Sequence, residues 1–277
     1  MVEIRPSLSA PLCIVLAVDR SGSMGRQIKG SPRTTLGDAA TKLVNSIIME
    51  LILLSMRSLG EVRHYFDIGI FGYGFMPAAG TVSVASLLPR ELGELGICDL
   101  PALADSPARV EKYEKDRWPV WVDTAHEGRT PMCQALSLIG SQLVGWVGDH
   151  SLSPPPVIVN ITDGLVTDSP YEGASLEAWV DRLSSIKTAT GVAKIFDLFL
   201  SPEVDNPVLR PATIDCLTLP GWTVTQVASI LPDVSISTWP SLSTMEPEKG
   251  PGTPTFTHQA ELADDQVHLV ITNERHK

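Results

Sequence analysis

Three short, almost wholly apolar segments constrain what this chain can fold into more than any other feature. They span residues 12–18 (LCIVLAV), 156–162 (PVIVNIT) and 193–200 (AKIFDLFL). Runs of this length that are rich in Val, Ile, Leu and Phe are typical of strands buried on both faces of a parallel sheet. A fourth, more mixed segment, residues 64–71, is predicted to form a strand nearer an edge.

Longer segments with helical spacing lie between these strands. Residues 35–58 place apolar side chains three and four positions apart, and residues 131–147 and 176–187 do the same. Alternation of strands and helices predicts an α/β, doubly wound domain with a mostly parallel central sheet flanked by helices. Residues 81–87 are predicted to add one antiparallel edge strand.

The length of 277 residues favours one substantial domain with elaborations. We expect this domain to span residues 1–235, with an insertion at about residues 90–127 that contains a polar, helical piece at 107–117. Residues 236–277 are predicted to form a linker rich in Pro and Gly and a carboxyl-terminal strand extension. Further elements are expected beyond residue 200: strands at 213–219 and 267–272 and a helix at 223–231.

The net charge of −11 argues against a nucleic-acid backbone or an anionic membrane as the main partner, because both require a basic surface. The four cysteines form no CxxC pair, so neither a zinc knuckle nor a disulfide framework is indicated. The apolar stretch at residues 11–18 is too short for a secretory signal, and no stretch reaches the roughly 20 apolar residues of a membrane helix. We therefore expect a cytoplasmic protein.

Oxygen-bearing side chains follow two of the predicted strands. Asp19, Ser21 and Ser23 occupy alternate positions directly after the first strand, so all three side chains are expected to point to one place. Asp163 emerges at the end of the second apolar strand, in the sequence ITDG. Because the carboxyl ends of parallel strands meet at one edge of a sheet, Asp19 and Asp163 are predicted to share a rim.

A third hydroxyl belongs to Thr130 in the sequence GRTP, just before a helical segment. This placement predicts a helix N-cap at Thr130, followed by Pro131 in the first turn. Hard cations prefer oxygen ligands, and Mg²⁺ usually retains waters and only one or two carboxylates, whereas zinc prefers Cys and His. The sequence therefore predicts a site for Mg²⁺, with Mn²⁺ or Ca²⁺ as alternatives.

These residues, in this order, resemble the metal-ion-dependent adhesion site of von Willebrand factor A (VWA), or integrin I-like, domains. The matching parts are a DxSxS loop (Asp19, Ser21, Ser23), a GxTP turn (Thr130) and a TDG strand end (Asp163). The resemblance covers about the first 200 residues apart from the insertion. It implies that the two serines bind the ion directly, that both aspartates act directly or through water, and that Thr130 does so according to conformational state.

The resemblance also implies a non-catalytic function. Such domains leave one coordination position open for an acidic side chain of a partner protein. Small stand-alone VWA proteins occur in prokaryotes beside kinases, phosphatases or AAA+ ATPases in stress-response and defence clusters. We therefore expect a cytoplasmic adaptor whose partner is one of these proteins.

The alternative is a Mg²⁺-dependent hydrolase or phosphatase that uses Asp19 or a metal-bound water, with Asp163 or His126 as the base. Two observations weigh against it. Ser21 stands where an aspartyl-nucleophile phosphatase would need a second Asp, and Ser23 does not lie in a GxSxG nucleophile elbow.

Two further pairs of residues admit two interpretations each. Trp118 and Trp121 are separated by two residues in the insertion, and packing of the insertion is favoured over a partner-binding surface. Arg20 and Arg26 flank the metal loop, where they either steer an acidic partner or act as solvated loop charges.

Overall fold

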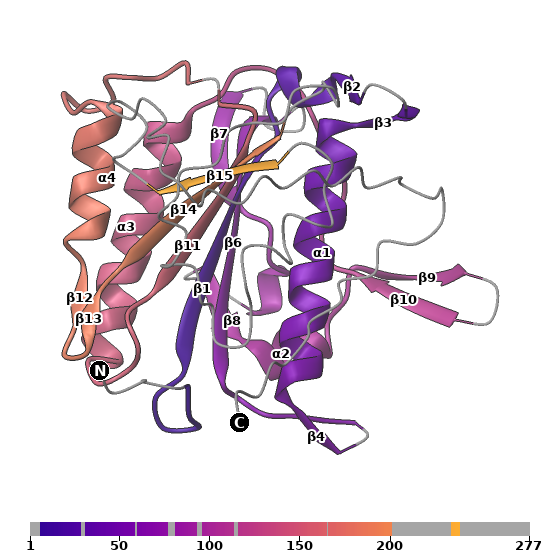
Figure 1. Ribbon diagram of the computed structural model, residues 1–277, viewed down its shortest axis with the longest axis vertical. Coiled ribbons are helices and arrows are strands. Elements are labelled where there is room, and N and C mark those ends of the chain that lie inside the picture. Colours follow the sequence, from indigo (N-terminus) through magenta and orange to yellow (C-terminus); the bar gives the residue numbers. More distant parts are fainter. Residues whose placement is uncertain are drawn as a thin grey trace, which may run out of the picture.

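The computed structural model describes residues 6–28, 31–58, 60–76, 81–92, 96–113, 116–164, 166–200 and 234–238. Its centre is a seven-stranded sheet in the order β15-β14-β11-β1-β6-β7, with β8 also paired to β6 (Figure 1). Four strands are parallel: β1 (Leu12–Asp19), β6 (Phe66–Met76), β11 (Val157–Thr162) and β14 (Lys194–Leu200). Three are antiparallel: β7 (Thr81–Ser86), β8 (Ile97–Asp99) and β15 (Val234–Thr238).

Helices cover both faces of this sheet (Figure 1). One face packs against α1 (Leu36–Ser55) and α2 (Leu100–Ala104), and the other against α3 (Met132–Asp149) and α4 (Leu176–Ser184). All eight residues of β1 are buried, and its side chains alternate between the two hydrophobic clusters. This alternation explains why the strand sequence is apolar at every position rather than at every second one.

The first helix begins where its sequence supplies a cap. The Thr35 hydroxyl accepts a hydrogen bond from the backbone N–H of Asp38 at 3.1 Å, and the Asp38 carboxylate accepts one from the backbone N–H of Thr35 at 2.8 Å. This capping box satisfies two backbone donors that a helix start leaves without partners. It fixes the start of α1 at Leu36, close to the loop that follows β1.

Smaller elements lie in the segments that connect these strands and helices. They are η1 (Gly22–Gly25), β2 (Gln27–Ile28), β3 (Ser31–Thr35), β4 (Met56–Ser58), β5 (Glu61–Val62), η2 (Arg90–Leu92), β9 (Arg109–Tyr113), β10 (Asp116–Val120), β12 (Lys187–Thr188) and β13 (Gly191–Val192). No helix of the described residues is long and apolar enough to span a membrane.

The predicted α/β architecture with a mostly parallel sheet is confirmed, and two details need correction. The edge strand expected at residues 81–87 is present as β7, but β8 and β15 are antiparallel as well. The prediction of a helix at residues 107–117 is wrong, because β9 and β10 form an antiparallel hairpin that projects from the domain (Figure 1). That polar segment offers no apolar stripe at helical spacing, and pairing as a ribbon satisfies its backbone instead.

The two tryptophans of the insertion have different surroundings. Trp121 is buried, and its Nε1–H donates to the backbone carbonyl of Leu103 at 2.8 Å, whereas Trp118 on β10 is 37% exposed. Packing, the favoured interpretation, therefore holds for Trp121 alone. The elements predicted at 213–219, 223–231 and 267–272, and the Pro- and Gly-rich linker, lie outside the described residues.

Candidate metal centre

Asp19 is the last residue of β1, and its carboxylate is held at both oxygens. Asp19 is buried and only 1% exposed. Its Oδ1 accepts a hydrogen bond from the backbone N–H of Ser21 at 2.9 Å, and its Oδ2 accepts one from the Thr162 hydroxyl at 2.8 Å. Because each oxygen has its own donor, the orientation of this carboxylate is fixed by β11 and by the loop that follows β1.

The two serine hydroxyls of that loop face each other. Ser21 Oγ and Ser23 Oγ are 2.9 Å apart, with Ser21 buried and Ser23 partly exposed. The 3-10 turn η1 brings them together, since the backbone N–H of Met24 donates to the Ser21 carbonyl at 3.1 Å. The fully buried Met24 side chain anchors the turn in the core. The predicted convergence of these hydroxyls is therefore present.

Asp163 lies one residue beyond β11, on the same rim as Asp19. Parallel pairing of Val18 with Ile161 places Thr162 beside Asp19 and puts Asp163 next along the edge. The Asp163 side chain is fully buried, and its Oδ2 accepts a hydrogen bond from Arg26 Nη2 at 2.9 Å.

Thr130 belongs to a third loop that is bonded to the first. The backbone N–H of Gly22 donates to the Gly128 carbonyl at 3.0 Å. This bond joins the loop that carries Ser21 and Ser23, the serine loop, to the turn before Thr130. Thr130 is 2% exposed, and its backbone exchanges two hydrogen bonds with Thr167, at 2.9 and 3.0 Å. Among the contacts of the described residues, none joins the Thr130 hydroxyl directly to Asp19, Ser21 or Ser23.

The prediction that Thr130 caps α3 is wrong. The helix begins one residue later than such a cap would require, with Pro131 at the N-cap position and no side-chain cap there. Asp168 supplies the missing acceptors instead: its two oxygens accept from the backbone N–H groups of Cys133 and Gln134 at 3.0 and 2.9 Å. The Thr130 hydroxyl is thus not committed to the helix start.

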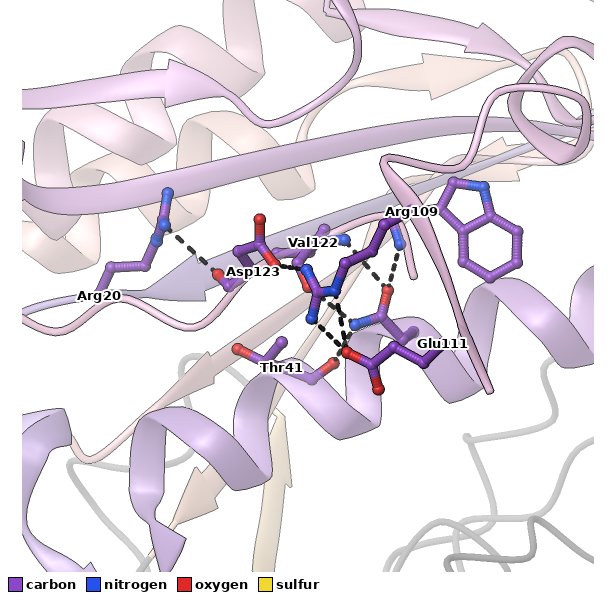
Figure 2. Close-up of polar contacts among 8 residues, drawn as sticks. Arg20, Thr41, Arg109, Glu111, Val122 and Asp123 are labelled. Atoms are coloured by element: carbon purple, nitrogen blue, oxygen red, sulfur yellow. Dashed lines mark hydrogen bonds and ion pairs between the residues drawn. The ribbon is translucent and has the colours of Figure 1, made fainter. Parts of the chain in front are cut away.

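A buried asparagine fixes the chain that leads into this third loop. Asn45 on α1 donates from Nδ2 to the carbonyls of Thr41 and Val122, both at 2.9 Å, and accepts at Oδ1 from the backbone N–H groups of Trp121 and Val122 at 2.8 and 3.1 Å. Figure 2 shows Thr41 and Val122 of this cluster near Asp123. The segment from 121 to 123 is therefore anchored to α1 just before it reaches the rim.

Charged side chains complete the same corner. Arg109 forms ion pairs with Asp123 and with Glu111, the latter at 2.6 Å, and Arg20 Nη2 donates to the Asp123 carbonyl at 3.4 Å (Figure 2). Further along, the backbone N–H of Glu127 donates to the Arg20 carbonyl at 2.8 Å. The two loops are consequently joined at Arg20 as well as at Gly22.

Burial raises the pKa of Asp19 from its ordinary value of 3.8 to about 6, and the nearby charge of Asp163 adds to this rise. The hydrogen bonds from Ser21 and Thr162 act in the opposite direction but do not cancel the effect of burial. Two neighbouring carboxylates with little access to water repel each other when both are ionised. A cation between them would relieve that repulsion.

The donor chemistry of this rim fits a hard divalent ion. It offers two carboxylates and three hydroxyls, all oxygen donors, and too few carboxylates to saturate such an ion. Within the described ranges, no three His, Cys, Asp or Glu side chains are grouped so as to hold a metal. A centre at this rim would therefore depend on the hydroxyls of Ser21, Ser23 and Thr130 as much as on the two aspartates.

His126, the base considered for a hydrolase, packs against the serine loop. A Cβ atom on Gly25 would lie 2.9 Å from His126 Nδ1, and one on Gly37 would lie 3.3 Å from the His126 ring. The histidine therefore lies between the loop and the start of α1. Within the described part of the chain, no hydrogen bond links its ring to Asp19.

Several residues around the rim escape sequence reasoning. Thr162 was visible only as a hydroxyl at the end of an apolar strand, and Asp168 carries no local signal because its partners lie more than 30 residues away. Beneath the rim, Tyr73 donates to Asn160 at 2.7 Å, and Asn160 donates to Asp197 at 2.7 Å. Burial raises the pKa of Asp197 well above its usual range. In the sequence, these residues could have been noticed only as polar residues within otherwise apolar strands.

Comparison of the chain with protein-family models and with curated proteins found no match.

Proposed function

We propose that this chain is a VWA-type, metal-dependent interaction module that binds a partner protein through a divalent ion, Mg²⁺ in the first instance. The observation that carries the proposal is the convergence of three loops at one rim. They present Asp19, Ser21, Ser23, Thr130 and Asp163 at the carboxyl ends of parallel strands with helices on both faces. Ligands of open α/β sheets bind at this end of the strands.

The second support is the balance of charge in the donor set. Two carboxylates neutralise a divalent ion without filling its coordination shell, since Mg²⁺ takes six ligands. A carboxylate from a partner would complete that shell and form a direct link between the proteins. We therefore propose that the partner contributes an acidic side chain. We further propose that the partner is a kinase, phosphatase or AAA+ ATPase of a stress-response or defence system, and that the two proteins meet in the cytoplasm.

The test is a partner capture from the native host in four conditions: wild type and Asp19→Ala, each with Mg²⁺ or with EDTA. The proposal requires a partner that is retained by wild type in Mg²⁺ and lost in the other three conditions. The purified partner must then bind the purified chain with the same metal dependence. Recovery of the same proteins in all four conditions would contradict a metal bridge.

The rival function, a Mg²⁺-dependent hydrolase, is separated by a direct assay. Hydrolysis of a generic phosphoester by wild type that is lost with both Asp19→Ala and His126→Ala would favour the enzyme. The adaptor predicts no difference in hydrolysis between wild type and either variant.

A further inference from the structure

We propose that Arg26 is a resident counter-ion of the candidate metal centre, which occupies an oxygen of Asp163 and must leave it before a divalent ion binds with full strength. This inference rests on the proposed function, because it concerns the same centre. It assigns to Arg26 a defined role in setting metal affinity, beyond that of a solvated loop charge.

The contact is local and specific. Arg26 Nη2 lies 2.9 Å from Asp163 Oδ2, although the two residues are 137 positions apart in sequence. The same guanidinium donates from Nε to the Ser23 carbonyl at 3.2 Å, so it is held by the serine loop while it reaches across to β11. One side chain therefore contacts two of the three loops that form the centre.

The burial of the two partners is unequal. The Asp163 side chain is fully buried, whereas the Arg26 side chain is 48% exposed. A buried carboxylate without a cation is costly, so the guanidinium compensates Asp163 in the metal-free protein. Because Arg26 is half exposed, it can move into solvent without leaving a buried charge of its own.

A divalent ion and the guanidinium cannot both make their best contacts with Asp163. The conflict is electrostatic, because the positive charge of Arg26 repels a divalent ion at short range. Binding of the ion thus exchanges a single positive charge at Asp163 for a double one. The guanidinium released at the rim, beside the open coordination position, would then be available to an acidic partner.

The test measures Mg²⁺ affinity by isothermal titration calorimetry for wild type, Arg26→Gln, Arg129→Gln and Asp19→Ala, and repeats it with Mn²⁺. Arg129 is an exposed arginine of the neighbouring loop, so its substitution removes the same charge near the centre without the contact to Asp163. We expect Arg26→Gln to bind about tenfold tighter than wild type, as the loss of one charge-assisted hydrogen bond would give. Arg129→Gln should stay within about twofold.

Thermal melting supplies an independent readout. In EDTA, Arg26→Gln should melt below wild type, because Asp163 loses its ion pair with Arg26, and saturating Mg²⁺ should reduce or abolish that difference. Equal Mg²⁺ affinities of Arg26→Gln and Arg129→Gln, or weaker binding by Arg26→Gln, would overturn the inference while leaving the metal centre intact. Absence of Mg²⁺ binding in both wild type and Arg26→Gln would overturn the proposed function together with it.

Discussion

Replacement of Asp19 by asparagine should stabilise the metal-free protein while removing its response to metal. A pKa of about 6 in place of 3.8 means that the folded protein holds a proton on Asp19 more tightly than the unfolded chain does. Between about pH 4 and about pH 6, stability therefore falls as pH rises, and above about pH 6 the whole cost is present. Asparagine cannot ionise and avoids that cost.

The magnitude follows from the size of the rise. A pKa change from 3.8 to about 6 corresponds to about 3 kcal/mol at neutral pH. Asparagine keeps an acceptor for the backbone N–H of Ser21 but presents an amide to the Thr162 hydroxyl, which offsets part of the gain. We expect a net gain of about 1–3 kcal/mol, or roughly 3–8 °C in melting temperature.

The assay is urea unfolding in EDTA at pH 4, 5, 6 and 7.5 for wild type, Asp19→Asn and the control Asp181→Asn. Asp181 is an exposed residue of α4, so its substitution should change stability by less than about 0.5 kcal/mol. The advantage of Asp19→Asn should be absent at pH 4 and reach its full size above pH 6. A variant that is less stable than wild type at pH 7.5, or a difference that does not vary with pH, would refute the reasoning.

Three further outcomes are expected. Mg²⁺ affinity should be constant above pH 7 and weaken roughly tenfold per pH unit below pH 6, because a proton competes with the ion for Asp19. Calorimetry at pH 5, 6 and 7.5 measures this dependence, and an affinity that does not change with pH would contradict the prediction. Asn45→Leu should lower the free energy of unfolding by about 3–5 kcal/mol, since three buried backbone groups of residues 121–122 lose their partner. Urea unfolding measures this loss, and a loss no larger than that of the control Lys42→Ala, at an exposed residue, would contradict the prediction. Asp168→Ala should cost about 1–2 kcal/mol by the same assay because two N–H groups at the start of α3 lose their acceptor, and an unchanged midpoint would count against that assignment.

The sequence predicted the parts of the fold that depend on local pattern. Strands β1, β11 and β14 were visible because burial on both faces demands apolar residues at almost every position, and α1 was visible from its apolar stripe. The hairpin of β9 and β10 was missed because most of its side chains are polar and its stability comes from backbone pairing rather than from an apolar face.

The placement of the candidate ligands also followed from local pattern, since strand ends and alternation put Asp19 and Asp163 on one rim. The contacts between the rim and residues distant in sequence did not follow from local pattern. Arg26 reaches Asp163 across 137 positions, and Asp168 caps α3 across more than 30, so only the folded chain brings these partners together. No periodicity or motif encodes such pairs, and Thr130 was consequently assigned a capping role that Asp168 fills.

The most direct test of the central claim is a crystal structure of the chain grown in Mn²⁺, with anomalous difference density used to locate the ion. The account predicts one strong peak at the rim, within coordination distance of oxygens from Asp19, Ser21 and Ser23, with Asp163 and Thr130 bound directly or through water. It also predicts that Arg26 no longer contacts Asp163. A structure with Mn²⁺ bound elsewhere, or with no ion at the rim and the pair between Arg26 and Asp163 intact at saturating Mn²⁺, would contradict it.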